Sequence, residues 1–258
     1  MTDDTDTEVA RQSQLLEIAL VAWLREVRQL IDLGFLRPKP LLRYEGAVRS
    51  EASAREVAQW VRQSLGFGTE PVESLIDLCE RAGQFVLVTG IPGDGASAVD
   101  GDIAVSIVSL RGDPGRRRAT AAHELGHLIV GDEYSSDLGV HASRAKRESA
   151  VDAFASELLL PSQVFAIEGD RAGVISRDQL VQLAARYRAS WSLALRQAGH
   201  AGVLDASARR QWSQAVPTRG SCEVGAATGF GVDTSATGLC PRRCRSVATR
   251  PCHPGEGC

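Results

Sequence analysis

The sequence predicts an α+β fold that is mainly helical and contains a small sheet. Apolar residues recur every three or four positions over most of the first 214 residues, which is the period of amphipathic helices. Two short runs between helical stretches are instead rich in β-branched and aromatic residues, and these predict strands. Because no segment repeats elsewhere in the chain, we do not expect a repeat architecture.

Seven helices follow from this periodicity. The first, at residues 9–36, carries an apolar stripe that includes Leu16, Trp23 and Val27 and ends before Pro38. We interpret it as a helix packed on the main domain or on a partner, with a truncated helix-turn-helix as the alternative. Pro71 is expected to open the third helix. The other six helices are expected at residues 53–65, 71–83, 117–130, 144–160, 178–197 and 206–214.

The two predicted strands are residues 85–89 and 102–110, joined by a turn-rich loop at 90–101. Residues 218–258 are rich in Gly, Arg, Thr, Pro and Cys, and they cannot bury enough apolar surface to offset the entropy of ordering. The sequence therefore predicts a helical extension at 1–45, a main domain at 46–217 and a disordered tail at 218–258. The alternative for the tail is a second zinc site built from its cysteines and His253.

Composition limits the classes of function. A chain of 258 residues can bury one sizeable core, and a net charge of −3 gives no general attraction to nucleic acid or anionic membranes. No apolar run approaches the ~18 residues that a membrane span needs. The acidic N-terminus lacks the pattern of a signal peptide, and the six cysteines are interpreted as reduced thiols. The expected location is the cytoplasm.

The motif His123-Glu-Leu-Gly-His127 lies in the predicted helix 117–130. Residues four apart on a helix lie on one face, so His123 and His127 can direct ring nitrogens to one ion at the ~2.0–2.1 Å of a Zn–N bond. Glu124 lies about 100° further round, where its carboxylate can reach a water as general base. Gly126 is expected to let another backbone approach. Surface histidines or a closed structural zinc site are the alternatives.

A third zinc ligand must come from another segment, because position 133, where one known pattern has a histidine, is a glutamate. Glu148 lies on the apolar face of the predicted helix 144–160, and a carboxylate directed at a core is costly unless it is paired or binds metal. Asp152, one turn later, could accept the free ring N–H of a ligand histidine. Glu157 falls on the opposite face and is expected to be solvated.

Other roles remain open for these acids. Glu148 could form an ion pair with Arg144 or Lys146, and Asp152 could be an ordinary polar helix residue. The alternative ligands in the intervening segment are Asp132, Glu133, Asp137 and His141.

The two motif helices, 118–130 and 148–161, resemble the ImmA/IrrE-type metallopeptidases. Those proteins carry a HELGH-like helix and then a helix of the form Glu-x-x-Ala-Asn-x-Phe-Ala-x-x-Leu-Leu-x-Pro. This chain differs at Val151 and Asp152, and the resemblance covers roughly residues 52–214. It matches at Glu148, Phe154, Ala155, Leu158, Leu159 and Pro161.

The resemblance implies a zincin-like domain with its small sheet flanking the active-site helix. It further implies one catalytic Zn2+ ion held by His123, His127 and Glu148. In such folds an edge strand can bind an extended substrate, and residues 102–110 are expected to be that strand.

The function implied by the resemblance is that of a zinc-dependent endopeptidase acting in the cytosol on a regulatory protein, a repressor-type transcription regulator linked to stress response. Zinc would lower the pKa of its water, and Glu124 would take the proton. Tyr134, His141 and His200 are the candidates for an oxyanion donor. Direct nucleic-acid binding and membrane association are not expected. The alternatives are a non-catalytic zinc-containing or antitoxin-like module that sequesters a partner, and a DNA-binding regulator with a vestigial peptidase core.

Overall fold

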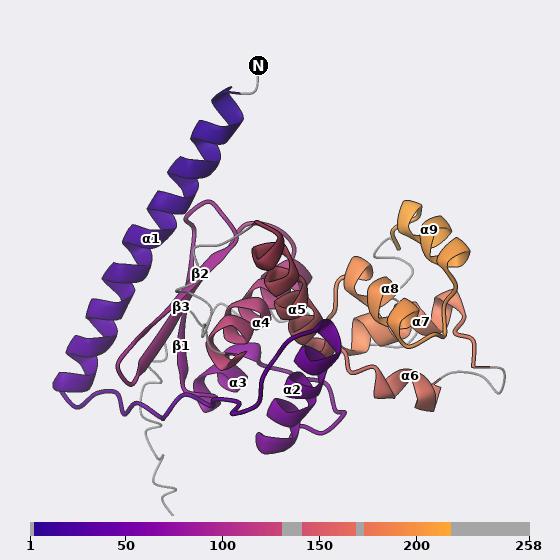
Figure 1. Cartoon of the computed structure of the whole chain (residues 1–258), viewed down its shortest axis with the longest axis horizontal. Coiled ribbons are helices and arrows are strands. Elements are labelled where there is room, and N and C mark those ends of the chain that lie inside the picture. Colours follow the sequence, from indigo (N-terminus) through magenta and orange to yellow (C-terminus); the bar gives the residue numbers. More distant parts are fainter. Residues whose placement is uncertain (1–2, 131–140, 169–172, 218–258) are drawn as a thin grey trace, which may run out of the picture.

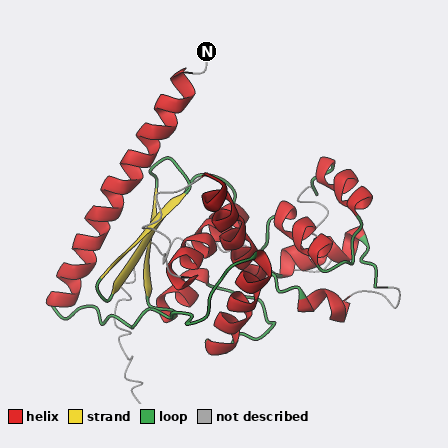
Figure 2. Ribbon diagram, viewed as in Figure 1, coloured by secondary structure: helices red, strands yellow, loops and turns green. Residues whose placement is uncertain are grey.

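The computed structural model describes residues 3–130, 141–168 and 173–217, and the predicted tail at 218–258 lies outside them. The fold is α+β and mainly helical, which confirms the predicted class. Figure 2 shows a small sheet among the helices. The helices are α1 (Asp3–Asp32), α2 (Glu51–Ser64), α3 (Leu75–Arg81), α4 (Pro114–Val130), α5 (His141–Leu159), α6 (Gln163–Glu168), α7 (Arg177–Arg186), α8 (Trp191–His200) and α9 (Ala206–Gln214).

The sheet has three strands in the order β1-β3-β2, so β3 lies in the middle. β1 (Gln84–Thr89) runs parallel to β3 (Ile103–Ser109), and β2 (Gly95–Asp100) is antiparallel to it. Side chains alternate between the two faces. Val105 and Ile107 belong to a cluster with α1, whereas Val108 belongs to the larger core with α4 and α5.

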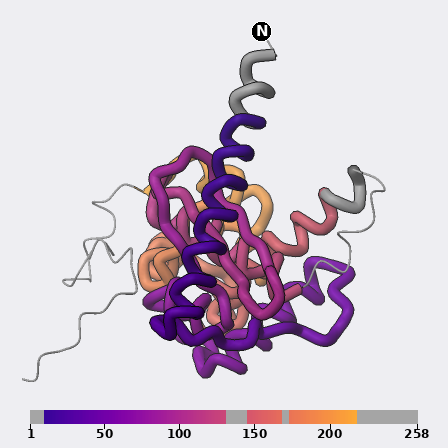
Figure 3. The backbone as a smooth tube through the Cα atoms, turned by 90° about the vertical axis from the view of Figure 1, so that its left-hand side faces the viewer, coloured from indigo at the N-terminus to yellow at the C-terminus, as the bar shows by residue number. Residues whose placement is uncertain are grey.

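Helices cover both faces of the sheet (Figure 1). α1 packs along one face, and Leu16, Leu20 and Val27 on its apolar stripe pack with Val105 and Ile107, which are fully buried. The turned view in Figure 3 has α1 lying along the strands. This packing confirms that the first helix packs on the body of the protein. The division into a helical extension at 1–45 and a main domain at 46–217 stays a prediction.

The other face of the sheet carries α4, with α5 and α2 behind it and α6 to α9 further away (Figure 1). Polar caps define where several of these helices begin. Ser50 and Ser53 form a capping box at α2, and Ser176 and Gln179 form one at α7. Asp205 caps α9, which has the bounds that the sequence predicts. In the part of the chain that the structure describes, no helix is long and apolar enough to span a bilayer.

The structure differs from the predicted elements at four places. β2 lies inside the segment predicted as a loop, because its residues are mostly small and carry little strand signal until they pair with β3. α3 begins after Ser74, which caps it, and not at Pro71. The helix predicted at 178–197 is two helices, since the chain turns at Arg188 (φ 51°) and Ser190 caps α8. The short helix α6 was not predicted.

Glu157 on α5 is the clearest departure from the expected burial. The helical pattern predicts a solvated side chain, but Glu157 is fully buried, because α5 is covered by α2 and α8 on the side away from α4. Its carboxylate accepts hydrogen bonds from Gln59 (2.9 Å), Gln197 (2.9 Å) and the backbone and hydroxyl of Ser162 (3.0 and 2.9 Å). Arg55 lies 3.5 Å away. A buried carboxylate is tolerated here because its oxygens are satisfied.

Candidate metal centre

The candidate centre lies where α4 and α5 pack against each other, and Gly126 sets how closely they approach. A Cβ at this position would lie 2.8 Å from Cδ1 of Phe154 and 3.0 Å from Cγ1 of Val151. Both neighbours are side chains of α5, so the expectation that another backbone approaches Gly126 is wrong. The glycine instead lets two buried side chains of α5 fill the space against α4, which brings the motif helix close to Glu148.

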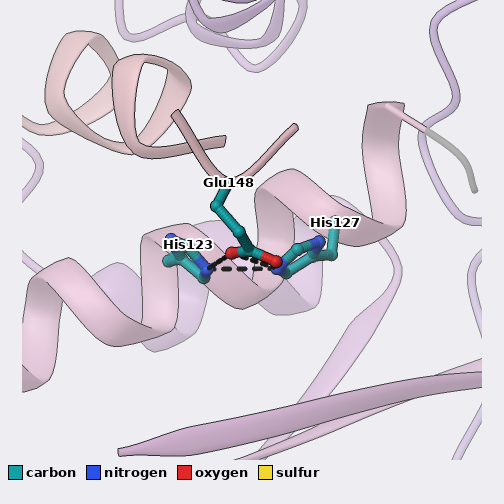
Figure 4. Close-up of side chains that lie close together, drawn as sticks. All are labelled: His123, His127 and Glu148. Atoms are coloured by element: carbon teal, nitrogen blue, oxygen red, sulfur yellow. Dashed lines mark hydrogen bonds and ion pairs between the residues drawn. The ribbon is translucent and has the colours of Figure 1, made fainter. Parts of the chain in front are cut away.

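Three side-chain donor atoms converge at this helix contact (Figure 4). The Nε2 atoms of His123 and His127 lie 3.0 Å apart. Oε2 of Glu148 lies 3.3 Å from the first of these nitrogens and 3.7 Å from the second. The structure therefore brings together the three residues that the sequence predicts as metal ligands, two from α4 and one from α5.

Asp152 lies behind His123. Its Oδ1 is 3.0 Å from Nδ1 of His123, on the side of the ring away from Glu148. A proton on Nδ1 satisfies this hydrogen bond and leaves the Nε2 lone pair directed at the other two donor atoms. Burial of the ring opposes protonation of His123, but Asp152 and the nearby carboxylates outweigh it and raise the pKa of the histidine. The hydrogen bond from His123 holds the pKa of Asp152 below its usual range.

The centre opens to solvent on the side of Glu148. The side chain of Glu148 is 45% exposed, against 23% for each histidine. The expectation that Glu148 lies on a buried face is therefore only partly right: it extends from the edge of the α4–α5 contact, at the entrance to the site. Such an entrance is what a substrate would need to reach the three donor atoms.

Glu124 points toward the sheet and not toward the solvent-exposed side of the centre. It is 7% exposed, and the hydroxyl of Ser97 on β2 donates a hydrogen bond of 2.6 Å to its Oε2. Burial raises the pKa of Glu124, while Ser97 and the two histidines of the motif lower it in part. The base candidate is thus held between α4 and the edge of the sheet.

β2, and not β3, is the strand that flanks the centre. The prediction that residues 102–110 form the edge strand is wrong, because β3 pairs on both sides while β2 has no other partner strand among the described residues. Ser97 and Gly95 were also missed, because the sequence predicts a loop where β2 lies. One signal could have found them: Gly101-Asp102 is a two-residue turn with Gly101 at φ 61°, and it joins β2 to β3 as a hairpin.

Other residues considered from the sequence lie elsewhere. Tyr134 and the alternative ligands Asp132, Glu133 and Asp137 are outside the described residues, as is the side chain of His141. His200 lines a separate hollow with residues of α6.

The arginines that precede the motif contact the protein itself. Arg116 pairs with Asp94 (2.7 Å), Arg117 donates to the carbonyl of Leu110 (3.0 Å) and Arg118 donates to that of Val72 (2.6 Å). They attach the start of α4 to its neighbouring segments.

Comparison with known proteins identifies the segment that holds this geometry. The model of the Peptidase M78 family, described as the IrrE N-terminal-like domain, matches residues 96–198. This segment is similar to the IrrE N-terminal-like domain. The match begins in β2 and ends in α8, so it contains Ser97, both histidines, Glu124 and Glu148. The helices and small sheet form the zincin-like α+β fold of that family, which is zinc-dependent in general.

A solved structure described as a Mycobacterium tuberculosis transcriptional regulator is also similar. The two chains are 20% identical, with a TM-score of 0.43, over 57% of this chain and 46% of that one. The chain thus spans less than half the length of that structure. No curated protein matches the sequence.

Proposed function

We propose that this protein is a zinc-dependent endopeptidase that hydrolyses a peptide bond in a cytosolic regulatory protein, of the repressor type of transcription regulator. The observation that carries the proposal is the convergence of His123, His127 and Glu148 with an intact Glu124 beside them, inside an IrrE N-terminal-like domain. The substrate class comes from the resemblance of the two motif helices to ImmA/IrrE-type peptidases.

The donor set fits zinc. Tetrahedral coordination at ~2.0–2.1 Å places neighbouring ligand atoms about 3.3–3.4 Å apart. The distances of 3.0, 3.3 and 3.7 Å between the donor atoms bracket that value. Two imidazoles and one carboxylate also leave a fourth position, as in catalytic zinc sites. His123, His127 and Glu148 would hold the ion, and Asp152 would orient His123.

A zinc ion bound there would polarise the scissile carbonyl and acidify a water molecule. Glu124 would act as the general base, which takes a proton from the attacking water and delivers it to the leaving nitrogen. Burial raises the pKa of the Glu124 carboxyl, which agrees with a group that accepts a proton and returns it. Pure metal binding would need no carboxylate at that place.

An extended peptide could bind along β2. This strand pairs with β3 on one side only, within the described residues, and its Ser97 contacts Glu124. A substrate strand added to the open side would bring its backbone past the base by β-augmentation.

The test compares three full-length proteins: wild type, Glu124→Gln and Glu148→Ala. Each is assayed for bound zinc by atomic emission and for cleavage of the purified repressor encoded nearest in the genome. We expect the wild type to bind one zinc and cleave, Glu124→Gln to keep zinc and lose cleavage, and Glu148→Ala to lose both. Cleavage that persists in Glu124→Gln would contradict the catalytic assignment. A wild type that binds the repressor and zinc without cleaving it would favour a sequestering module. Full zinc occupancy in Glu148→Ala would indicate that the third ligand lies among residues 132–141.

A further inference from the structure

Two serines lie directly opposite each other on the sheet face that carries α4. Ser97 of β2 and Ser106 of β3 are partners in the antiparallel register, so their side chains emerge on the same face. Only one of them reaches the motif helix. The Ser97 hydroxyl donates to Glu124, whereas the Ser106 hydroxyl is fully buried and has no hydrogen-bond partner among the described residues.

Gly95 makes room for the Glu124 carboxylate on the same strand. A Cβ at Gly95 would lie 3.1 Å from Oε1 of Glu124 and 2.7 Å from Cγ2 of Thr120. Residues 95 and 97 are two apart on a strand and face the same way. The carboxylate therefore lies along β2, with Oε1 over the glycine and Oε2 bonded to the serine.

This contact fixes a side chain that would otherwise have several rotamers. A glutamate has three rotatable bonds, and burying it without a hydrogen-bond donor is unfavourable. The distance of 2.6 Å is typical of a strong O–H···O⁻ bond. The strand that supplies the hydroxyl is itself held by β3 and by an ion pair between Arg28 of α1 and Asp100.

We propose that Ser97 is a positioning residue for the general base, holding the Glu124 carboxylate in the orientation in which it takes and returns the proton. The inference rests on the proposed function. Among the described residues, the Ser97 hydroxyl forms no hydrogen bond with the three metal-binding candidates, so its role is to align the base and not to bind the ion. The expected consequence is a loss of turnover without a loss of zinc or of substrate binding.

The experiment uses a matched pair of serine variants in the full-length protein. Ser97→Ala removes the hydroxyl bonded to Glu124, Ser106→Ala removes its unbonded neighbour on the same face, and Ser97→Thr restores a hydroxyl. One readout is independent of activity: the infrared carboxylate stretch of Glu124, taken as the difference between each protein and the same protein carrying Glu124→Gln. The others are zinc content, thermal midpoint, and kcat and KM on the preferred member of a quenched-fluorescent peptide library.

We expect Ser97→Ala to shift the carboxylate stretch and to lower kcat by about 10- to 100-fold with an unchanged KM, the usual effect of removing a partner behind a catalytic group. Zinc content and thermal midpoint should stay as in the wild type. Ser106→Ala should match the wild type in both stretch and kcat, and Ser97→Thr should recover most of the turnover.

An unshifted carboxylate stretch in Ser97→Ala would overturn the inference whether or not the protein is a peptidase. An active wild type with unchanged kcat in Ser97→Ala would overturn the inference and leave the proposed function intact. If the wild type cleaves neither the repressor nor any library member, the endopeptidase function is wrong and the positioning role falls with it. A shifted stretch would in that case report the hydrogen bond alone.

Discussion

At the scale of single residues, two side chains of the centre each have a hydrogen-bond partner behind them. Asp152 accepts from Nδ1 of His123, and Ser97 donates to Glu124. These contacts fix the orientation of the His123 ring and of the Glu124 carboxylate. A histidine whose Nδ1 carries the proton presents an unprotonated Nε2, which is the form a metal requires.

Asp152 should therefore control how protons compete with zinc. The pKa of His123 is raised above its ordinary value of 6.5. Protons therefore compete with zinc for this ring at a pH above 6.5, and zinc affinity should begin to fall there as the pH is lowered. Asp152→Ala removes the hydrogen bond that raises the pKa, so the onset should move to lower pH. At pH 8 the same variant should bind zinc about 10- to 100-fold more weakly.

Competition with a chromophoric chelator between pH 5.5 and 8 would measure both effects. Asp152→Asn is the matched control, because its amide oxygen can still accept from Nδ1 of His123 while the charge is lost. We expect its zinc affinity to lie between those of the wild type and Asp152→Ala. If Asp152→Ala binds zinc with the affinity and pH dependence of the wild type, Asp152 is an ordinary polar residue of α5.

At the scale of elements, the spacing of α4 and α5 determines whether the donor atoms meet. Gly126→Ala should gain helix propensity but push a methyl group against the buried ring of Phe154, at 2.8 Å. Overpacking of this kind costs about 1–3 kcal/mol. Because the helix contact also holds Glu148 beside the histidines, zinc affinity should fall together with the free energy of unfolding.

A double-mutant cycle with Phe154→Leu would test this explanation. If the clash with Phe154 is the cause, the two substitutions should be less destabilising together than the sum of their separate effects. Urea denaturation and chelator competition would be measured for all four proteins. Strictly additive effects would instead indicate that Gly126 acts through the backbone of α4 alone.

The helices could be predicted from the sequence where the residues that favour a helix, such as an apolar stripe or a cap, lie close together in the chain. The apolar stripe of α1, the caps of α9 and the motif helix α4 can all be read from neighbouring residues. β2 could not be read in that way, since Gly95, Ala96 and Ala98 carry little strand preference of their own. Its conformation depends on pairing with β3, which is a contact between separate strands.

At the scale of the whole molecule, two contacts join α5 and the sheet to segments distant in sequence. One is Glu157, whose buried carboxylate binds Gln59 of α2 and Gln197 of α8. Glu157→Ala would remove the acceptor of the half-buried Gln59 and the charged partner of Arg55, and should destabilise the protein by about 3–5 kcal/mol in urea denaturation. Glu56→Ala, at an exposed position of α2, is the control and should have little effect. A small loss in Glu157→Ala would mean that water replaces the carboxylate.

The second contact is the packing of α1 on the sheet. Leu20 is 8% exposed and packs in the cluster that buries Val105 and Ile107, so Leu20→Ala should cost about 2–5 kcal/mol. Ile18 on the opposite face of α1 is 60% exposed, and Ile18→Ala should leave the thermal midpoint almost unchanged. Equal effects of the two substitutions would mean that α1 does not pack on the sheet in solution.

The sequence by itself determined the part of the centre that one helix can encode. The 3.6-residue period of a helix fixes the relative placement of His123, Glu124 and His127. The same period placed Glu148 and Asp152 on one side of α5. The tertiary structure alone decided that β2 is the edge strand, that Ser97 lies beneath Glu124 and that Glu157 is buried. The physical reason is that helix geometry is fixed by hydrogen bonds between near neighbours, whereas strand order and burial depend on which distant segments pack together.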